Sequence, residues 1–382
     1  MRFVTLYPRA KNVQLVKDMG MIPYYIKTLF NEDAKLVTYK NDESYPYLDT
    51  VVKGAKVEFI KKVFGRQIDG MIYTFIHAKE IDVLNLYHLN TATFLSEIAY
   101  RLRNKNGKIY LKLDISMEGL RTVQIKDPRG FIKRMDIKLA DIVSCETKII
   151  QKRLNELFDK EIIYVTNGCL MGDDESLDLS EDVNTNSEKT ILTVAKFGTY
   201  EKASDTLLYA FAKSADRHDY NLKIIGTVEE SFKSVIEKFF SEYPNMRERV
   251  IFAGEIHDRA ALKNEYRRAR IFTLPSRRES FGIVLVEAAY EGCYLVTTEA
   301  TPAGYDVSDN GKYGLIAKTD DIDDLADKFV KICTDEDFDW NKHAAGISEY
   351  AKSVFDWEKI VTYLYGKIKE ELKKQNTNCS IV

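Results

Sequence analysis

Short apolar runs alternate with amphipathic helical stretches along nearly the whole chain, and this alternation limits the possible fold more than any other feature. Apolar runs of this length indicate strands that are buried on both faces. The predicted strands span residues 2–7, 35–39, 82–89, 108–114, 141–145 and 162–167 in the first half and 190–197, 221–226, 249–254, 270–275 and 293–299 in the second. The stretches between them, such as 91–104, fit helices. Strands joined by helices form parallel sheets covered on both sides, so we predict the α/β class.

Two such series with a break between them indicate two doubly wound, Rossmann-like domains. The break falls at residues 171–188, which are acidic, poor in large apolar residues and rich in Ser, Asp and Asn, and therefore predict a linker. The first domain then spans residues 1–170 and the second residues 189–354. The last amphipathic stretch predicts a long helix broken near Phe355, so that residues 355–382 form a separate C-terminal helix. A chain of 382 residues is long enough for two cores.

The net charge of −3 conceals a basic first half. Residues 1–170 contain 28 Lys and Arg against 20 Asp and Glu, a balance of +8, so the remainder of the chain carries −11. Such an asymmetry points to an anionic partner. The basic half consists of ordinary strand and helix patterns without a recognition motif, so we do not expect that partner to be nucleic acid.

Several features favour a cytoplasmic protein. No run approaches the roughly 18 apolar residues of a transmembrane helix. The first residues, MRFVTLYPRAKN, lack the apolar core and cleavage site of a signal peptide and predict a strand instead. The five cysteines are scattered without the spacing of a zinc site, and we expect reduced thiols.

The stretch PSRRESFGIVLVEAAYEGC, from Pro275 to Cys293, places a carboxylate at each end of an apolar segment. Glu279 lies in the predicted loop, Ser280 is the predicted N-cap, and the helix is predicted from about Gly282 to Glu291. The start of such a helix presents backbone N–H groups and the positive end of a dipole, which together attract an anion. Glu287 would lie roughly 8–9 Å further along, at ~1.5 Å per residue.

One carboxylate before a phosphate-sized site and one behind it match the layout of a nucleotide sugar. Carboxylate oxygens accept charge-assisted hydrogen bonds from the hydroxyls of the sugar and of the ribose. Alternatively, Glu279 only caps the helix and Glu287 is solvated. The apolar surroundings of Glu287 in IVLVEAA argue for a partner, because burying an unpaired carboxylate is costly.

The run TDDIDDLADKF imitates an Asp-x-Asp metal and nucleotide-sugar motif, but it also opens a helical pattern. Acidic residues in the first turn of a helix are favoured by the helix dipole, so we interpret this run as a capped helix start rather than a metal site.

The glutamate segment resembles the Glu-x7-Glu signature of the retaining GT-B glycosyltransferases, family 4 (glycosyl transferases group 1). ILTVAKFGTYEKASDTLLYAF resembles the strand, loop and helix of that family that carry two basic phosphate ligands, which fall here on Lys196 and Lys202. The first of these is more often arginine, so Lys196 would act as a point charge. VTNGC, RVIFAGEI and FDWEKIVTYLY also resemble segments of the family, and the resemblance covers nearly the whole chain.

By this resemblance the second domain holds the donor, and the two domains face a cleft in which the reaction takes place. Glu279 would bind hydroxyls of the donor sugar and Glu287 those of the ribose. Lys196 and Lys202 would neutralise the charge that builds on the leaving diphosphate. The segment between the glutamates would supply backbone N–H groups to the phosphates and complete the donor site, through Ser280, Phe281, Gly282 and Ile283. Outside this family, two lysines six residues apart would indicate only a solvated loop.

The first half matches the family less well. VKDMGMIPYY resembles the glycine turn that faces the donor diphosphate, so Gly20 is its candidate there, although an ordinary helix start explains it equally well. Many family members have a sugar-facing histidine where this chain has Leu113. Asp114 and His88 are therefore candidates for the sugar or acceptor side. Asp114 alternatively caps a turn, and a lone histidine such as His88 is more often a structural hydrogen-bonding residue.

The acceptor is expected on the first domain. Residues 124–143 interleave apolar residues with five basic ones, Lys126, Arg129, Lys133, Arg134 and Lys138. This stretch fits an anionic membrane surface or the phosphate of a lipid-linked acceptor, and it fits a solvated helix face equally well.

We therefore predict a retaining enzyme that moves a sugar from a nucleoside diphosphate, UDP more readily than GDP, to a glycan or lipid-linked saccharide. The expected context is bacterial surface polysaccharide or glycoconjugate synthesis, in the cytoplasm or peripherally on the inner membrane face. We expect no metal and no cofactor, because lysines and a helix start already serve the diphosphate. The alternatives are another nucleotide-sugar enzyme of this fold, an epimerase or a phosphorylase, and a binding protein without activity.

Overall fold

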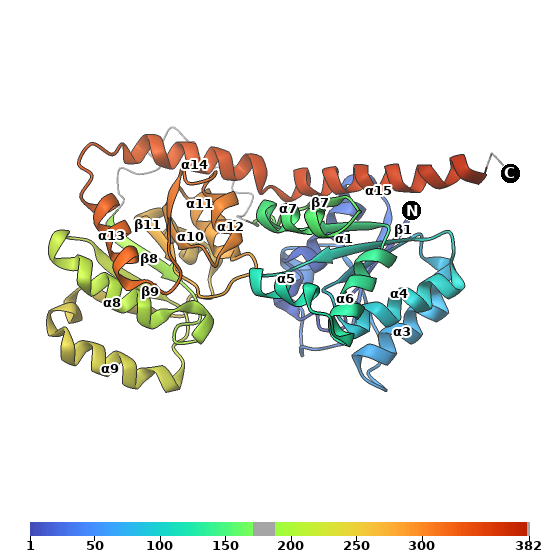
Figure 1. Cartoon of the computed structure of the whole chain (residues 1–382), viewed down its shortest axis with the longest axis horizontal. Helices are drawn as coiled ribbons and strands as arrows, with labels where there is room; N and C mark the ends of the chain where they lie inside the picture. Colours follow the sequence, from blue (N-terminus) through green and yellow to red (C-terminus); the bar gives the residue numbers. More distant parts are fainter. Residues whose placement is uncertain (171–187, 380–382) are drawn as a thin grey trace. The chain divides into compact units, whose positions relative to one another are not determined.

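The computed structural model describes residues 1–170 and 188–379, so the predicted linker lies almost entirely outside the described residues. The chain divides into two compact units (Figure 1). The N-terminal unit comprises Met1–Leu170 together with Phe355–Val382, and the C-terminal unit comprises Met171–Val354. Each unit is built around one parallel sheet, so the predicted α/β class with two Rossmann-like sheets is confirmed.

The N-terminal sheet has seven parallel strands in the order β3-β2-β1-β4-β5-β6-β7. Their bounds are β1 Arg2–Leu6, β2 Asp33–Thr38, β3 Lys56–Phe59, β4 Val83–Tyr87, β5 Lys108–Leu113, β6 Ile142–Cys145 and β7 Ile162–Tyr164. The chain builds outward from β1 to β3 on one side and from β4 to β7 on the other. The point where this order reverses, between β1 and β4, is where sheets of this kind hold ligands beyond the carboxyl ends of their strands.

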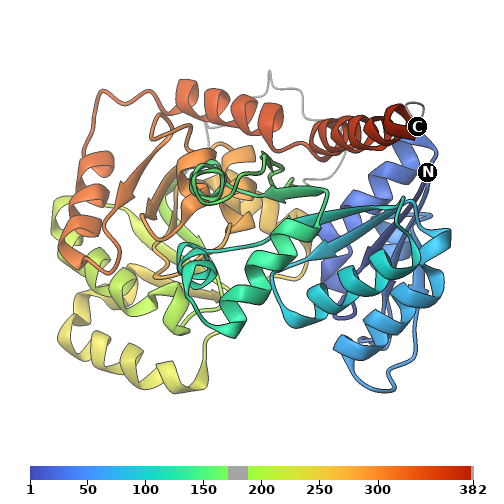
Figure 2. The ribbon, with the colours of Figure 1, turned by 45° about the vertical axis from the view of Figure 1, so that its right-hand side comes forward.

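Helices cover both faces of this sheet and create two cores. One core joins the sheet to α1 (Asp18–Phe30) and α15 (Trp357–Cys379), and the other joins it to the remaining long helices. These are α3 Arg66–His77, α4 Thr91–Arg103, α5 Met117–Gln124, α6 Pro128–Leu139 and α7 Lys148–Leu157, while α2 Tyr47–Thr50 is a single turn. Helices α3 and α4 pack side by side along the lower edge of the unit (Figures 1 and 2).

The predicted break in the last helix is confirmed. Helix α14 (Trp340–Val354) ends one residue before Phe355, and α15 begins at Trp357. Asp356 starts the new helix, because its carboxylate accepts the backbone N–H of Lys359 at 2.9 Å. Helix α15 lies along α1, where the rings of Tyr365 and Phe30 stack with centroids 3.8 Å apart.

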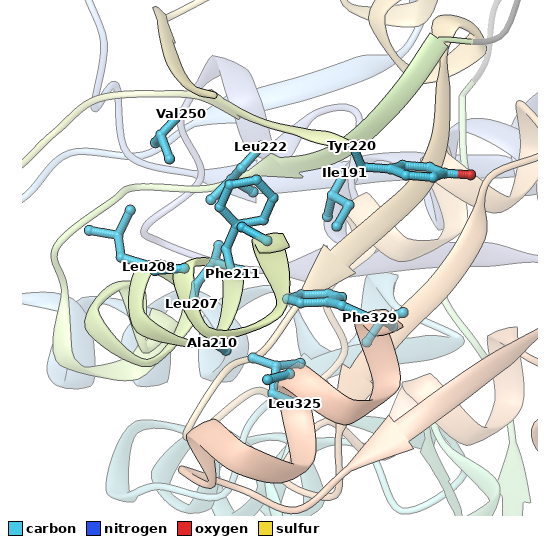
Figure 3. Packing of buried hydrophobic residues seen from close by; sticks show 14 of the residues in the cluster. Ile191, Leu207, Leu208, Ala210, Phe211, Tyr220, Leu222, Val250, Leu325 and Phe329 are labelled. Atoms are coloured by element: carbon cyan, nitrogen blue, oxygen red, sulfur yellow. The ribbon is translucent and has the colours of Figure 1, made fainter. Parts of the chain in front are cut away.

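The C-terminal sheet has six parallel strands in the order β10-β9-β8-β11-β12-β13. Their bounds are β8 Glu188–Val194, β9 Asn221–Ile225, β10 Val250–Gly254, β11 Ala269–Leu274, β12 Tyr294–Thr298 and β13 Gly314–Ala317. The helices are α8 Ser204–Ser214, α9 Lys233–Glu242, α10 Arg259–Arg268, α11 Ile283–Tyr290, α12 Pro302–Val307 and α13 Ile322–Cys333, followed by α14. Phe211 of α8, Leu222 of β9 and Phe329 of α13 belong to its buried core (Figure 3). The strand order reverses between β8 and β11.

Two strands were missed from the sequence, and both lie at sheet edges. In β3, KVEF, charged side chains alternate with Val57 and Phe59, and the strand is partly exposed. β13 is the short run GLIA and forms one edge of the C-terminal sheet. An edge strand packs against only one neighbour and therefore carries a weaker apolar pattern than a central strand. The predicted strands also ran too far, because Tyr7 and His88 lie just beyond β1 and β4.

Candidate functional site

The loops that follow β8 and β11 lie at the point where the strand order of the C-terminal sheet reverses. Most of the sequence-predicted donor residues fall on these two loops and on the start of α11. Two backbone hydrogen bonds join the loops, because the N–H groups of Arg277 and Arg278 donate to the carbonyl oxygen of Glu201 at 2.8 and 3.4 Å. The two loops therefore form one surface although 77 residues separate Glu201 from Arg278 in the chain.

Lys202 and Glu279 form an ion pair at the centre of this surface. Their side chains retain 25% and 15% of their exposure, so the pair is shielded but open to a ligand. The structure thus brings together two of the residues that the sequence placed at the donor. Because the backbone N–H of Glu279 donates to Ala300 O at 3.3 Å, the carboxylate is also positioned from the loop after β12.

Arg277 fixes the geometry around this pair, and the sequence analysis gave it no role. Its guanidinium donates to Asp205 and to Asp320, at 2.8 Å in each case, and therefore ties the starts of α8 and α13 to the glutamate loop. The hydrogen bond from Arg277 lowers the pKa of Asp320 and keeps it ionised. Its position beside the predicted Glu279 was the one feature that could have indicated this role.

Helix α11 begins one residue later than predicted, with Gly282 rather than Ser280 as its N-cap. Gly282 has φ 81°, and a Cβ there would lie 2.9 Å from Leu274 and 3.3 Å from Glu279. Glycine alone accepts this left-handed turn at low cost, so the turn and not the serine side chain sets the helix start. Phe281 is buried beneath it, while Ser280 and Ile283 are partly exposed. The start of α11 presents backbone N–H groups and the positive end of the helix dipole, which suits an anion at this position.

Glu287 has a protein partner, as its apolar surroundings suggested. The hydroxyl of the buried Tyr266 on α10 donates to Glu287 Oε2 at 2.8 Å. Glu287 is itself partly exposed on α11. The hydrogen bond orients the carboxylate without a ligand, and its assignment to ribose stays a prediction.

Lys196 is paired away from the Lys202–Glu279 pair. It forms an ion pair with Glu229 of the loop after β9, and its side chain is more than half exposed. Exposed ion pairs contribute little free energy, so an anionic ligand could take over this lysine at small cost. The loop turns at Gly198, whose φ of 96° and close approach to Phe232 require glycine.

The N-terminal unit gathers ionisable groups at the equivalent edge of its own sheet. The first residues after β1, β4, β5 and β6 are Tyr7, His88, Asp114 and Glu146. Lys112, fully buried on β5, donates to Val165 O at 3.0 Å.

Buried carboxyl groups surround that lysine. Asp18 lies 3.7 Å and Glu146 4.0 Å from Lys112 Nζ. Burial raises the pKa of Asp18 and of Glu146, and the neighbouring Asp114 raises both further. Asp114, partly exposed after β5, thus lies beside the buried carboxyls, and its role on the sugar or acceptor side stays a prediction.

A cavity of about 270 Å³ lies over the carboxyl ends of β1 and β4, where the strand order of the N-terminal sheet reverses. Its wall includes Arg9, Arg66, His88 and Asn90. His88 has φ 64°, uncommon for a residue other than glycine, and its ring meets Tyr7 edge-on at 5.8 Å. The structure thus places His88 in a cavity wall, and its role on the sugar or acceptor side stays a prediction.

Gly20 is explained by packing. It is the third residue of α1, not a turn before the helix, and a Cβ there would overlap the carbonyl of Leu15. Its predicted contact with the donor therefore has a sufficient structural alternative and stays a prediction.

The interpretation of TDDIDDLADKF as a helix start is confirmed. Asp321 is the N-cap of α13, and its carboxylate accepts the N–H of Asp324 at 2.9 Å. Among the described residues there is no group of three His, Cys, Asp or Glu side chains that could hold a metal ion. Whether the protein acts without a metal stays a prediction.

The basic stretch at 124–143 is partly engaged within the fold. Lys133 donates to Thr122, and Arg134 donates to the carbonyls of Val123 and Ile125, so these two cations hold α5 and α6 together. None of the described helices is long and apolar enough to cross a membrane.

Comparisons with known proteins bear on the class of the protein and on its fold. Residues 177–354 match the model of the family "Glycosyl transferases group 1". The chain is 26% identical over 353 residues to an uncharacterized glycosyltransferase of Methanocaldococcus jannaschii, with 91% of this chain and 92% of that protein covered.

Solved structures give the fold. Anabaena HepE in complex with UDP superimposes with a TM-score of 0.73 at 15% identity, covering 97% of this chain and all of that one. The lipopolysaccharide outer core galactosyltransferase WaaB gives 0.71 at 15% identity, covering 96% of this chain and all of that one. The fold is therefore GT-B, and the chain is a glycosyltransferase that acts on sugar donors.

Proposed function

We propose that this glycosyltransferase transfers a sugar, with retention of its anomeric configuration as in family 4, from UDP to a glycan or a lipid-linked saccharide. The observation that carries the proposal is the Lys202–Glu279 ion pair beside the start of α11. The UDP-bound neighbour HepE supports UDP over GDP. The likeness to WaaB supports an acceptor that belongs to a surface glycan.

The C-terminal unit supplies what a diphosphate requires. The start of α11 offers backbone N–H groups, and Lys202 offers a partly shielded cation next to them. Lys196 adds a second cation once it leaves Glu229. Positive groups held in place before the reaction stabilise the charge that develops on the leaving diphosphate, and they need no reorganisation at that moment.

The two glutamates bind hydroxyl groups on either side of the diphosphate. Glu279 is held by Lys202 and by the loop geometry, so its carboxylate is ready to accept hydrogen bonds from the donor sugar. Glu287, oriented by Tyr266, accepts those of the ribose. The roles follow the family resemblance. Both carboxylates already have a partner in the protein that orients them, Lys202 for Glu279 and Tyr266 for Glu287.

For retention we favour displacement on one face of the sugar. The acceptor oxygen forms a bond to the anomeric carbon on the face from which the diphosphate oxygen leaves. That departing oxygen takes the hydroxyl proton of the acceptor. In this step Lys202 and the start of α11 stabilise the diphosphate, and no side chain forms a covalent bond.

The acceptor site is assigned to the cavity over β1 and β4. It is the binding point that the order of the N-terminal strands predicts, and Arg9 and Arg66 give it positive charge. Asp114 and the buried carboxyl cluster lie at the same sheet edge. Hydroxyl groups of a saccharide and a linking phosphate would both find partners there.

The test is a calorimetric titration with UDP, GDP and ADP in EDTA. It is run on the wild type, on Glu287→Ala and on Glu242→Ala. Glu242 is the matched control, because it also accepts a tyrosine hydroxyl, that of Tyr209 at 3.0 Å, but on α9 away from the site. We expect UDP to bind without metal, Glu287→Ala to lose most of that affinity, and Glu242→Ala to keep it. If no nucleotide binds, or if both variants bind equally well, the donor site is wrong and a binding protein without activity becomes the better interpretation.

A further inference from the structure

Helix α3 has two apolar faces, although only one of them is covered. Tyr73 and Thr74 point to the core and are buried. On the opposite side, Ile68, Phe75 and Ile76 are exposed at positions i, i+7 and i+8, which fall on one face of a helix. Met71 and Ile72, between them on the same face, are only half-buried.

The loop before α3 adds two more exposed apolar side chains. Val63 and Phe64 are 64% and 67% exposed. Their backbone is nevertheless fixed, because the carboxylate of the buried Asp69 accepts the N–H groups of Val63, Phe64 and Gly65 at 2.9, 2.9 and 3.1 Å. Burial opposes ionisation of Asp69, but these hydrogen bonds outweigh it and lower its pKa, so the loop is held by a charged carboxylate.

We call Val63, Phe64, Ile68, Phe75 and Ile76 the outer α3 surface. Exposed cations border it, namely Lys61, Lys62, Arg66, Lys79 and Arg103, the last of which lies over the ring of Phe75 at 4.7 Å.

The acidic groups beside this surface are already engaged. Asp69 holds the loop, Glu58 pairs with Lys35, and Glu80 accepts a hydrogen bond from His77. The surface therefore combines exposed apolar side chains with unbalanced positive charge.

We propose that the outer α3 surface docks on the face of a lipid bilayer that contains anionic lipids. Apolar side chains on one helix face with cations around them match the two layers that such a surface presents, namely acyl chains and negative headgroups. A folded protein partner would need complementary shape over a larger area, whereas a bilayer accepts a rounded helix and a projecting loop. We favour this surface over residues 124–143 as the membrane contact, because two of the five cations of that stretch, Lys133 and Arg134, are bound within the fold.

The position of the surface fits a lipid-linked acceptor. Arg66 and Gly70 of α3 also line the cavity assigned to the acceptor. A lipid whose tail stays in the bilayer would therefore bring its phosphate and saccharide to the cavity from the docked side. The docking inference rests on the proposed function only for this choice of acceptor, because binding to vesicles can be measured without a reaction.

The experiment measures flotation of the full chain with phosphatidylcholine vesicles, with and without phosphatidylglycerol. Binding is expected only with the anionic lipid, and added salt should weaken it. The double variant Val63→Asp/Phe64→Asp should lose binding roughly tenfold or more, because two apolar anchors are removed and two negative charges are added. Phe131→Asp is the matched control, since Phe131 is 55% exposed on α6 within residues 124–143.

A reporter variant tests the depth of insertion without disturbing the surface. Phe64→Trp should shift its emission to the blue and be quenched by brominated lipid in anionic vesicles only. Emission that does not change, or binding that Phe131→Asp abolishes and the double variant retains, would overturn the proposal. A dimer that forms in solution and disappears in the double variant would assign the surface to a second copy of the chain instead.

Calorimetric UDP binding by the double variant separates this proposal from the proposed function. If the double variant keeps its UDP affinity and no longer floats with vesicles, the docking proposal is supported independently of the donor site, which is proposed in the C-terminal unit. Lost UDP affinity would show that the variant is damaged, and the Phe64→Trp result then decides.

Discussion

The two units place ionisable side chains at the same point of the same kind of sheet, but they treat these side chains in opposite ways. At the C-terminal edge, Lys202 and Glu279 are paired and keep 25% and 15% of their exposure. At the N-terminal edge, the side chains of Lys112 and Glu146 are 0% and 2% exposed. The first pair can exchange its partner for a ligand, whereas the second group is enclosed by the protein.

Burial changes the chemistry that each edge offers. A carboxyl group whose pKa is raised by burial tends to stay neutral and can then donate a hydrogen bond as well as accept one. Burial raises the pKa of the carboxyls around Lys112, while Lys202 and Glu279 form an exchangeable ion pair. A diphosphate needs positive charge that a ligand can reach. The difference therefore supports donor binding in the C-terminal unit, where the paired side chains stay open to a ligand.

The largest effect is expected from the C-terminal pair. Lys202→Ala and Glu279→Ala should each lower kcat by roughly 10²-fold or more, because each removes a group aimed at the reacting end of the donor. Turnover with a UDP-sugar and a saccharide acceptor is the measurement, and thermal melting checks the fold.

Lys223→Ala is the control for that experiment. Lys223 and Glu265 form an ion pair in the same unit with side chains 20% and 19% exposed, close to the values of the site pair. Turnover near that of the wild type in both site variants would refute the site, and an equal loss in Lys223→Ala would reduce it to a stabilising ion pair.

A smaller effect is expected where the site depends on one hydrogen bond. Tyr266→Phe removes the hydroxyl that orients Glu287 and leaves the carboxylate in place. UDP affinity should fall roughly tenfold, in line with about 1.5 kcal/mol for a hydrogen bond to a charged group, and less than in Glu287→Ala. Calorimetry with UDP measures both variants, and an affinity unchanged in Tyr266→Phe would show that Glu287 does not need this partner.

The sequence predicted the parts of the molecule that depend on local pattern. Central strands, the break near Phe355 and the capped start of α13 follow from apolar runs and from cap residues, and all three are present. The Glu279-to-Glu287 segment was recognised in the same way, although its helix begins at Gly282 and not from a Ser280 cap. The turn depends on the backbone, which a side-chain pattern describes poorly.

The sequence could not predict which distant side chains meet. The pairing of Lys202 with Glu279, the support from Arg277 and the partner Tyr266 all depend on tertiary contacts between loops and helices. The outer α3 surface was missed because an apolar face on α3 looks the same in the sequence whether or not the fold covers it. Edge strands such as β3 were not predicted, because they are too exposed to show the apolar pattern of a buried strand.

In the N-terminal unit, the cavity should affect the acceptor and not the donor. Arg9→Ala is expected to raise the KM for a phosphate-bearing acceptor about fivefold, because an exposed cation contributes on the order of 1 kcal/mol to binding a phosphate. UDP affinity should not change. Arg129→Ala, an exposed cation on α6 away from the cavity, is the control. Equal effects of the two variants, or a change in UDP affinity, would move the acceptor out of this cavity.

The next variant tests buried acidity and should leave turnover intact. Burial raises the pKa of Asp136 on α6 to about 8 from 3.8. Between these values the folded chain keeps a proton that the unfolded chain releases, so this carboxyl makes stability fall as pH rises. Asp136→Asn should raise the melting temperature more at about pH 8 than at about pH 5. A gain that does not depend on pH would show that Asp136 is ionised in the folded state.

The smallest effect is expected from a histidine of the C-terminal unit, and its pH dependence has the opposite sign to that of Asp136. Burial lowers the pKa of His343 on α14 to about 4 from 6.5, and this ring packs against Tyr294. Below pH 6.5 the unfolded chain takes up a proton that the folded chain refuses until about pH 4, so this histidine makes stability fall as pH falls. His343→Phe keeps an aromatic ring and should lessen the fall in melting temperature on acidification. Asp136→Asn should instead raise the melting temperature mainly at alkaline pH. If both variants shift the same limb of the pH profile, the pKa of one of the two groups is not shifted in the direction that its burial predicts.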